Sequence, residues 1–88
     1  MAARILLFGY GNLASAMLDG WLASGLRPER FMAYNPRPKP VPAGVAFTTS
    51  LPQGPFDTLV LCVKPQQFDA VTPAVRALTG PDTLLVSI

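Results

Sequence analysis

An apolar run that passes straight into a glycine-rich turn constrains this chain more than any other feature. Residues 5–8 read Ile-Leu-Leu-Phe, and residues 9–14 read Gly-Tyr-Gly-Asn-Leu-Ala, a G-x-G-x-x-A pattern. The run has the length of a buried strand, and apolar residues after the turn recur at helical spacing. A strand, a tight glycine turn and a helix together form a site for a dinucleotide pyrophosphate. The alternative is a plain strand–helix turn without a ligand.

The small residues of this turn have separate expected roles. Gly9 allows the tight turn, Gly11 lets the backbone approach the phosphates, and Ala14 lets the helix lie close to the strand. The N-terminus of the helix offers free N–H groups and a partial positive charge to an anion. Asn12 is expected to cap this helix, and Gly25 suits the left-handed position just past its end.

Length, composition and charge limit the possible classes of protein. The chain has 88 residues, half of them hydrophobic, so we expect one globular domain over residues 1–88. A complete dinucleotide-binding domain is normally longer, which favours the front part of a larger protein. The net charge of +2 is small and scattered, so no nucleic-acid partner is expected.

The sequence shows no pattern typical of a targeting segment, a membrane span or a metal site. No stretch is long enough for a signal peptide or a membrane span, which favours a cytoplasmic protein without a membrane partner. The single Cys62 rules out an internal disulfide framework. Because the chain has no histidine, it cannot supply a histidine general base or a Cys/His zinc site, and no metal is expected.

Strand and helix patterns alternate along the chain, which is typical of a doubly wound α/β sheet. Pro73 is expected to split the second helix, because Thr72-Pro73 suits a cap and a first helical position. Strands are expected over residues 4–8, 30–34, 45–47, 58–63 and 83–88, and helices over residues 12–24, up to 71, and 73–78. These elements predict an incomplete Rossmann-type parallel sheet of about five strands with flanking helices.

The end of the second expected strand bears on cofactor choice. An NAD site has an Asp or Glu here that bonds the ribose 2′-OH, whereas this chain has Asn35, followed by Arg37 and Lys39. A carboxylate would repel a 2′-phosphate, and a neutral amide beside a guanidinium would accept one, so NADP is favoured over NAD. One alternative is that Arg37 and Lys39 are solvated loop charges. Another is that the proline-rich segment is a polyproline II ligand for an SH3-type domain, but a loop between two strands of a compact domain is a poor place for such a ligand.

The exit of the fourth expected strand is the second segment with chemical interest. In open parallel sheets ligands bind outside the carboxyl ends of the strands. A sharp exit at Lys64-Pro65 would place the backbone of Cys62 and Val63 near the nicotinamide half of a cofactor. Lys64 is either a functional cation or a solvated residue, and spacing leaves both open. We interpret Cys62 as a small core residue rather than a nucleophile.

Four segments together resemble the N-terminal domain of pyrroline-5-carboxylate reductase. They are Phe-Gly-Tyr-Gly-Asn-Leu-Ala-Ser-Ala-Met at 8–17, Asn-Pro-Arg at 35–37, Val-Lys-Pro-Gln at 63–66 and Leu-Leu-Val-Ser-Ile at 84–88. The family reduces 1-pyrroline-5-carboxylate to proline with NADPH or NADH. The resemblance implies a small-molecule substrate, and a helical C-terminal domain, absent from this chain, that builds the homo-oligomer and the imine site. No catalytic residue is therefore expected in this chain.

The resemblance also implies the cofactor-binding residues. Residues 8–13 would wrap the pyrophosphate, Asn35 and Arg37 would face the adenosine phosphate, and residues 62–65 would line the nicotinamide side. Pro36 separates Asn35 from Arg37, and Ser50 stands about where many members have a ribose-binding Asn. The full set is Phe8, Gly9, Tyr10, Gly11, Asn12, Leu13, Asn35, Arg37, Ser50, Cys62, Val63, Lys64 and Pro65.

Two other functions remain open at this point. One is the NADP-binding domain of another reductase, of the 3-hydroxyacid dehydrogenase or deazaflavin-dependent type. The other is a non-catalytic nucleotide-binding module that keeps the fold without the reaction.

Overall fold

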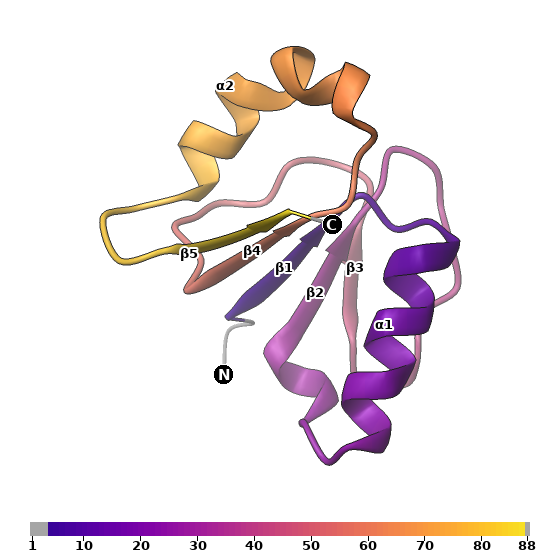
Figure 1. The fold of residues 1–88 in the computed structure, drawn as a ribbon. Coiled ribbons are helices and arrows are strands. Elements are labelled where there is room, and N and C mark those ends of the chain that lie inside the picture. Colours follow the sequence, from indigo (N-terminus) through magenta and orange to yellow (C-terminus); the bar gives the residue numbers. More distant parts are fainter. Residues whose placement is uncertain (1–3, 88) are drawn as a thin grey trace.

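Five parallel strands form a single sheet in the computed structural model, which describes residues 4–87 (Figure 1). The strands are β1 (Ile5–Phe8), β2 (Phe31–Tyr34), β3 (Ala46–Thr48), β4 (Thr58–Leu61) and β5 (Leu84–Ser87). The helices are α1 (Asn12–Ala23) and α2 (Phe68–Leu78), and single 3₁₀ turns, η1 (Pro28–Arg30) and η2 (Pro65–Gln67), precede β2 and α2.

The strand order is β3-β2-β1-β4-β5, and every neighbouring pair is parallel. The chain therefore builds outward from β1 in one direction and then, through β4, in the other. This is the doubly wound order of a Rossmann-type sheet, so the predicted fold class is confirmed. The reversal of strand order opens a crevice at the carboxyl ends of β1 and β4, which is where such sheets bind ligands.

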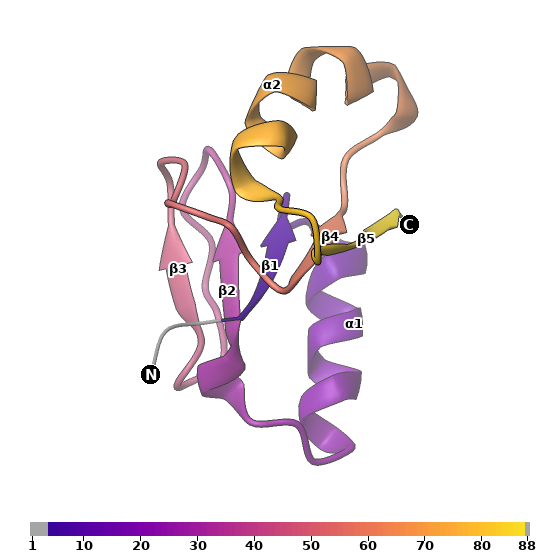
Figure 2. The ribbon, with the colours of Figure 1, turned by 90° about the vertical axis from the view of Figure 1, so that its left-hand side faces the viewer.

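Alternate residues of the central strands face two separate cores. Leu7, Ala33 and Val60 pack with Ala14 and Leu18 of α1, which runs alongside β1 and β2 in Figure 2. Leu6, Leu59 and Leu61 pack on the other face with Leu78 of α2. Central parallel strands are apolar on both faces for this reason. Each fully buried leucine contributes about 1.5–3 kcal/mol, so the two cores hold the sheet and thereby fix its carboxyl edge.

The predicted break in the second helix is wrong, because α2 continues through Pro73. Pro73 has no N–H for the carbonyl of Asp69, but both residues are exposed, so water can replace that bond. Thr72 does not cap a new helix: its hydroxyl donates to the carbonyl of Phe68 at 2.8 Å. The apolar face that includes Phe68 and Val75 packs on the sheet and keeps the helix in one piece.

Other expectations differ from the structure by smaller amounts. Asn12 does not cap α1, because Gly11 occupies the cap position with an extended backbone and Asn12 is already helical. Gly25 has φ +108°, as its predicted place after the helix requires. β4 ends at Leu61, so residues 62 and 63 lie in the following loop. β3 lies one residue later than expected, and the predicted end of the last strand at residue 88 lies outside the described residues.

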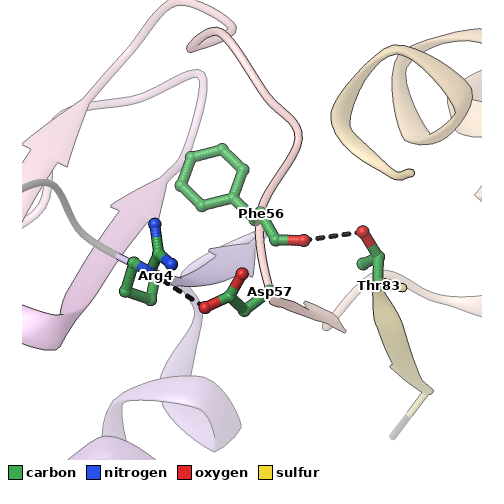
Figure 3. A network of polar contacts seen from close by, with 4 residues as sticks. All are labelled: Arg4, Phe56, Asp57 and Thr83. Atoms are coloured by element: carbon green, nitrogen blue, oxygen red, sulfur yellow. Dashed lines mark hydrogen bonds and ion pairs between the residues drawn. The ribbon is translucent and has the colours of Figure 1, made fainter. Parts of the chain in front are cut away.

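Polar contacts tie together the amino ends of the strands (Figure 3). The Nε of Arg4 lies 2.9 Å from the Oδ2 of Asp57, which joins the residues just before β1 and β4. The Thr83 hydroxyl donates to the carbonyl of Phe56 at 2.6 Å and accepts from the N–H of Gly80 at 2.8 Å. This end of the sheet is therefore closed by contacts within the protein.

Candidate functional site

Gly9 makes the turn at the carboxyl end of β1. Its φ is +93°, and a Cβ added there would lie 3.0 Å from the carbonyl oxygen of Cys62 and 3.2 Å from Cγ1 of Val63. A side chain would be strained by the backbone and would also press against the exit of β4. Gly9 therefore allows the chain to turn while it lies against the loop that follows β4.

Gly11 differs from Gly9 in both respects. Its φ is −98°, which any residue adopts, and an added Cβ would have no protein atom within 4 Å. The fold itself therefore does not demand glycine at this position. The space beside Gly11 is instead kept open at the start of α1, where a ligand would need to approach the backbone.

The N–H groups around the turn divide into used and available donors. The N–H of Gly9 donates to the carbonyl of Tyr34 at 2.9 Å, and that of Tyr10 donates to Oδ1 of Asn35 at 3.0 Å. The N–H groups of Asn12, Leu13 and Ala14 have no partner within the helix, and the first bond of α1 runs from the N–H of Ser15 to the carbonyl of Gly11 at 3.0 Å. The first turn carries no acidic residue, so the positive end of the helix dipole faces the open space. An anion would be bound by the first turn of α1.

A cavity of 340 Å³ lies between the end of β2 and the start of α2. Its floor is the glycine-rich turn, and Cys62 and Val63 close one side. The walls are Tyr34, Asn35 and Pro36 from the β2 side, and Lys64, Gln67 and Val71 from the β4–α2 side. The Tyr34 ring on one wall and the aliphatic Val71 side chain on the other suit a flat heterocycle.

A second cavity, also of 340 Å³, lies on the other side of the turn. It is lined by residues 11–14 at the start of α1 and by residues 62–65 at the exit of β4. Apolar groups dominate its surface, and Lys64 and Asn12 supply the polar ends. The glycine-rich turn and the exit of β4, the two segments predicted to contact the pyrophosphate and the nicotinamide, therefore meet at this cavity.

A third, smaller cavity of 130 Å³ lies between the start of α1 and the proline-rich loop. It is lined by Tyr10, Gly11, Asn12, Ser15, Lys39 and Pro40. Lys39 brings a positive charge to it, and Ser15 brings a hydroxyl. Gly11 lines this cavity and both of the others, so all three spaces meet at one glycine.

The structure brings most of the predicted site residues together around these cavities. The exceptions within residues 4–87 are Arg37 and Ser50, which line none of the three. Arg37 is exposed, and its carbonyl accepts a bond from Nδ2 of Asn35 at 2.8 Å. Ser50 forms a local turn, in which its N–H donates to the Thr48 hydroxyl at 3.1 Å.

Sequence reasoning missed several wall residues. Tyr34 is the last residue of β2, and this position at the carboxyl end of a strand was the available signal. Gln67 ends η2 and Val71 lies in α2, and no local pattern marked either residue. Ser15 lies in the first turn of α1, one residue beyond the glycine motif. The glycine motif predicted the turn but not the residues that form the walls of the cavities around it.

Cys62 and Lys64 occupy the same exit but differ in environment. Burial raises the pKa of the Cys62 thiol to about 11, so the thiol is neutral at physiological pH and is a poor nucleophile. Lys64 is exposed and lines both larger cavities, where its ammonium can reach an anionic ligand. Its backbone N–H donates to Oε1 of Gln67 at 3.3 Å, which helps to hold the turn.

No helix within residues 4–87 combines the length and the apolar character needed to cross a membrane. Nowhere in the same range do three or more His, Cys, Asp or Glu side chains gather as a metal site would require.

The parallel sheet, the glycine turn and the cavities at its carboxyl edge define a Rossmann-type dinucleotide-binding domain. Residues 4–88 match the family model described as NADP oxidoreductase, coenzyme F420-dependent, so the chain belongs to this family of NADP-dependent oxidoreductase domains. The same domain family occurs at the N-termini of pyrroline-5-carboxylate reductases. Neither the curated proteins nor the solved structures contain a significant match to the chain.

Proposed function

We propose that this chain is the cofactor-binding domain of a pyrroline-5-carboxylate reductase-type enzyme in the cytoplasm, which uses NADPH to reduce the imine of 1-pyrroline-5-carboxylate to L-proline. The observation that carries the dinucleotide part is the meeting of three cavities at Gly11, beside the free N–H groups of α1. The resemblance of four segments to that family supports the choice of reaction.

The residues around Gly11 fit a dinucleotide in three parts. The first turn of α1 binds the pyrophosphate through backbone N–H groups. Tyr34 and Val71, which line the first cavity, would contact the adenine, and Cys62 to Pro65 would line the nicotinamide side. The nicotinamide supplies the hydride when it is bound, and this chain contributes its position.

The neutral Asn35 and two cations favour a 2′-phosphate. Arg37 follows Asn35 in the loop, and Lys39 lines the small cavity beside Gly11. A charge-assisted hydrogen bond contributes about 1.5–3 kcal/mol, so losing one should weaken NADPH binding by roughly ten- to a hundredfold. NADH has no 2′-phosphate, so its affinity should hardly change.

Calorimetric titration of the wild type, Arg37→Ala and Lys39→Ala with both nucleotides tests this assignment. We expect Arg37 to contribute most of the preference. A loss confined to Lys39→Ala would instead assign the phosphate to the small cavity. Equal losses for both nucleotides would mean that the altered side chain supports the loop without contacting the phosphate.

The substrate half of the reaction requires residues outside this chain. We propose that the imine site and the oligomer belong to a helical C-terminal domain, so this chain alone should not oxidise NADPH in the presence of pyrroline-5-carboxylate. Imine-dependent NADPH oxidation by the purified 88-residue chain would contradict this.

The family description favours one second candidate, a reductase that exchanges a hydride between NADP and a deazaflavin. It would use the same cofactor site with a different second substrate. An enzyme assay of the polypeptide that contains this domain, with the imine and with the oxidised deazaflavin as alternative hydride acceptors, separates the two. Reduction of the deazaflavin and not of the imine would overturn the proposed proline-forming reaction.

A further inference from the structure

The side-chain amide of Asn35 joins two loops at the carboxyl edge of the sheet. Its Oδ1 accepts the N–H of Tyr10 in the glycine-rich turn at 3.0 Å. Its Nδ2 donates to the carbonyl of Arg37 in the proline-rich loop at 2.8 Å. The backbone N–H of Asn35 also donates to the carbonyl of Thr48, at the end of β3, at 3.2 Å.

These contacts require one acceptor and one donor on the same side chain. The N–H of Tyr10 needs an acceptor, and the carbonyl of Arg37 needs a donor. Asparagine supplies both through one planar group. An aspartate could still accept from Tyr10, but its second oxygen would face the Arg37 carbonyl at hydrogen-bond distance without a proton between them. The geometry therefore selects against a carboxylate at position 35.

We propose that Asn35 is a positioning residue for cofactor selectivity, which holds the loop of Arg37 and Lys39 against the glycine-rich turn. This inference rests on the proposed function, because it concerns the cofactor of that site. Tyr10 and Lys39 line the same 130 Å³ cavity, so the bond from Asn35 to Tyr10 helps to set its width. The side-chain hydrogen bonds of Asn35 go to Tyr10 and Arg37, and not to the N–H groups of the first turn of α1. Loss of the amide should therefore affect the 2′-phosphate part of the cofactor and spare the pyrophosphate part.

A direct contact between Asn35 and the ribose predicts a different outcome. If residue 35 reads the ribose hydroxyl itself, Asn35→Asp would supply the carboxylate of an NAD site and strengthen NADH binding. If Asn35 positions the loop, the same substitution releases the Arg37 carbonyl and gains nothing for NADH.

Nucleotide binding by Asn35→Ala and Asn35→Asp separates these two roles. We expect NADPH affinity to fall about tenfold or more in both variants, as for the loss of one charge-assisted contact, and NADH affinity to change by less than about threefold. Gln53→Ala, an exposed amide in another loop, is the matched control and should change neither. A tenfold gain of NADH affinity in Asn35→Asp, or an equal loss of both nucleotides, would overturn the proposal.

Amide hydrogen exchange without nucleotide tests the contact itself. The N–H of Tyr10 should exchange faster in Asn35→Ala and stay protected in Asn35→Asp, which keeps the acceptor. The N–H of Gly9, bonded to the carbonyl of Tyr34, is the internal reference and should not change. Unaltered exchange at Tyr10, or faster exchange at both positions, would overturn the positioning role. If the wild type bound neither nucleotide, the proposed function would fall, and the exchange result would still decide whether the contact exists.

Discussion

The two ends of this sheet are built for different purposes. At the amino end, Arg4 pairs with Asp57 and the Thr83 hydroxyl bridges Phe56 and Gly80, so polar groups are paired within the protein. At the carboxyl end, three cavities surround Gly11 and the first N–H groups of α1 face open space. The same five strands therefore carry a closed end that stabilises the fold and an open end that can bind a ligand.

Two glycines show the same difference at the level of single atoms. A Cβ on Gly54 would lie 2.8 Å from Cα of Leu78 and 2.9 Å from its carbonyl oxygen, so the protein itself fills that space. A Cβ on Gly11 would meet no protein atom within 4 Å. If the comparison is right, a substitution at the open position of the carboxyl end, Gly11, should change binding alone, and substitutions at the amino end should change stability alone.

The largest effect is expected for Gly11→Val. The side chain would occupy the space that the pyrophosphate needs, so NADPH affinity should fall by more than about a hundredfold, or about 2.7 kcal/mol. The fold should remain, because φ of −98° suits valine and no protein atom is in the way. Calorimetric titration gives the affinity, and circular dichroism checks the fold.

Gly20→Ala is the matched control for that substitution. Gly20 is exposed in the last turn of α1, and an added Cβ there also meets nothing within 4 Å. This variant should bind the nucleotide as the wild type does. If a folded Gly11→Val variant bound NADPH as tightly as the wild type does, the carboxyl end around Gly11 would not be the nucleotide site.

Gly54→Ala should produce the largest change of stability at the amino end. The new methyl group meets the backbone of Leu78, which cannot move aside as a side chain can. Overpacking of this kind costs about 2 kcal/mol in the free energy of unfolding. Urea denaturation measures the loss, and the folded fraction should keep its affinity for NADPH. If the folded fraction of this variant bound NADPH more weakly than the wild type does, the two ends of the sheet would be coupled.

Thr83→Val should have a smaller effect on the same end. Valine has nearly the shape of threonine but leaves the carbonyl of Phe56 and the N–H of Gly80 without their partner. The expected loss is about 1.5 kcal/mol in the free energy of unfolding, again by urea denaturation. Thr83→Ser keeps the hydroxyl and should recover most of it. If serine and valine behaved alike, packing of the methyl group would be the main contribution of Thr83.

The sequence predicted the β1–turn–α1 unit at the open end of the sheet better than it predicted α2 or the contacts between distant loops. The strand, the turn and the start of α1 were predictable because Gly9 and Ala14 fit local requirements of that unit. The continuous α2 was not, because the packing of its apolar face on the sheet outweighs the local preference of Pro73. The contact from Asn35 to Tyr10 joins residues 25 positions apart, which no local pattern reveals.

The smallest effect is expected for Arg4→Ala, although it removes the ion pair at the amino end. The Arg4 and Asp57 side chains are 54% and 57% exposed, so water and salt screen their attraction. The free energy of unfolding should fall by no more than about 0.5 kcal/mol, and the difference should shrink further in 0.5 M salt, about where such pairs are screened. A loss as large as that of Thr83→Val would mean that the ion pair carries this end of the sheet. The expected result instead assigns its stability to the partly buried hydroxyl bridge and to the close packing beneath Leu78.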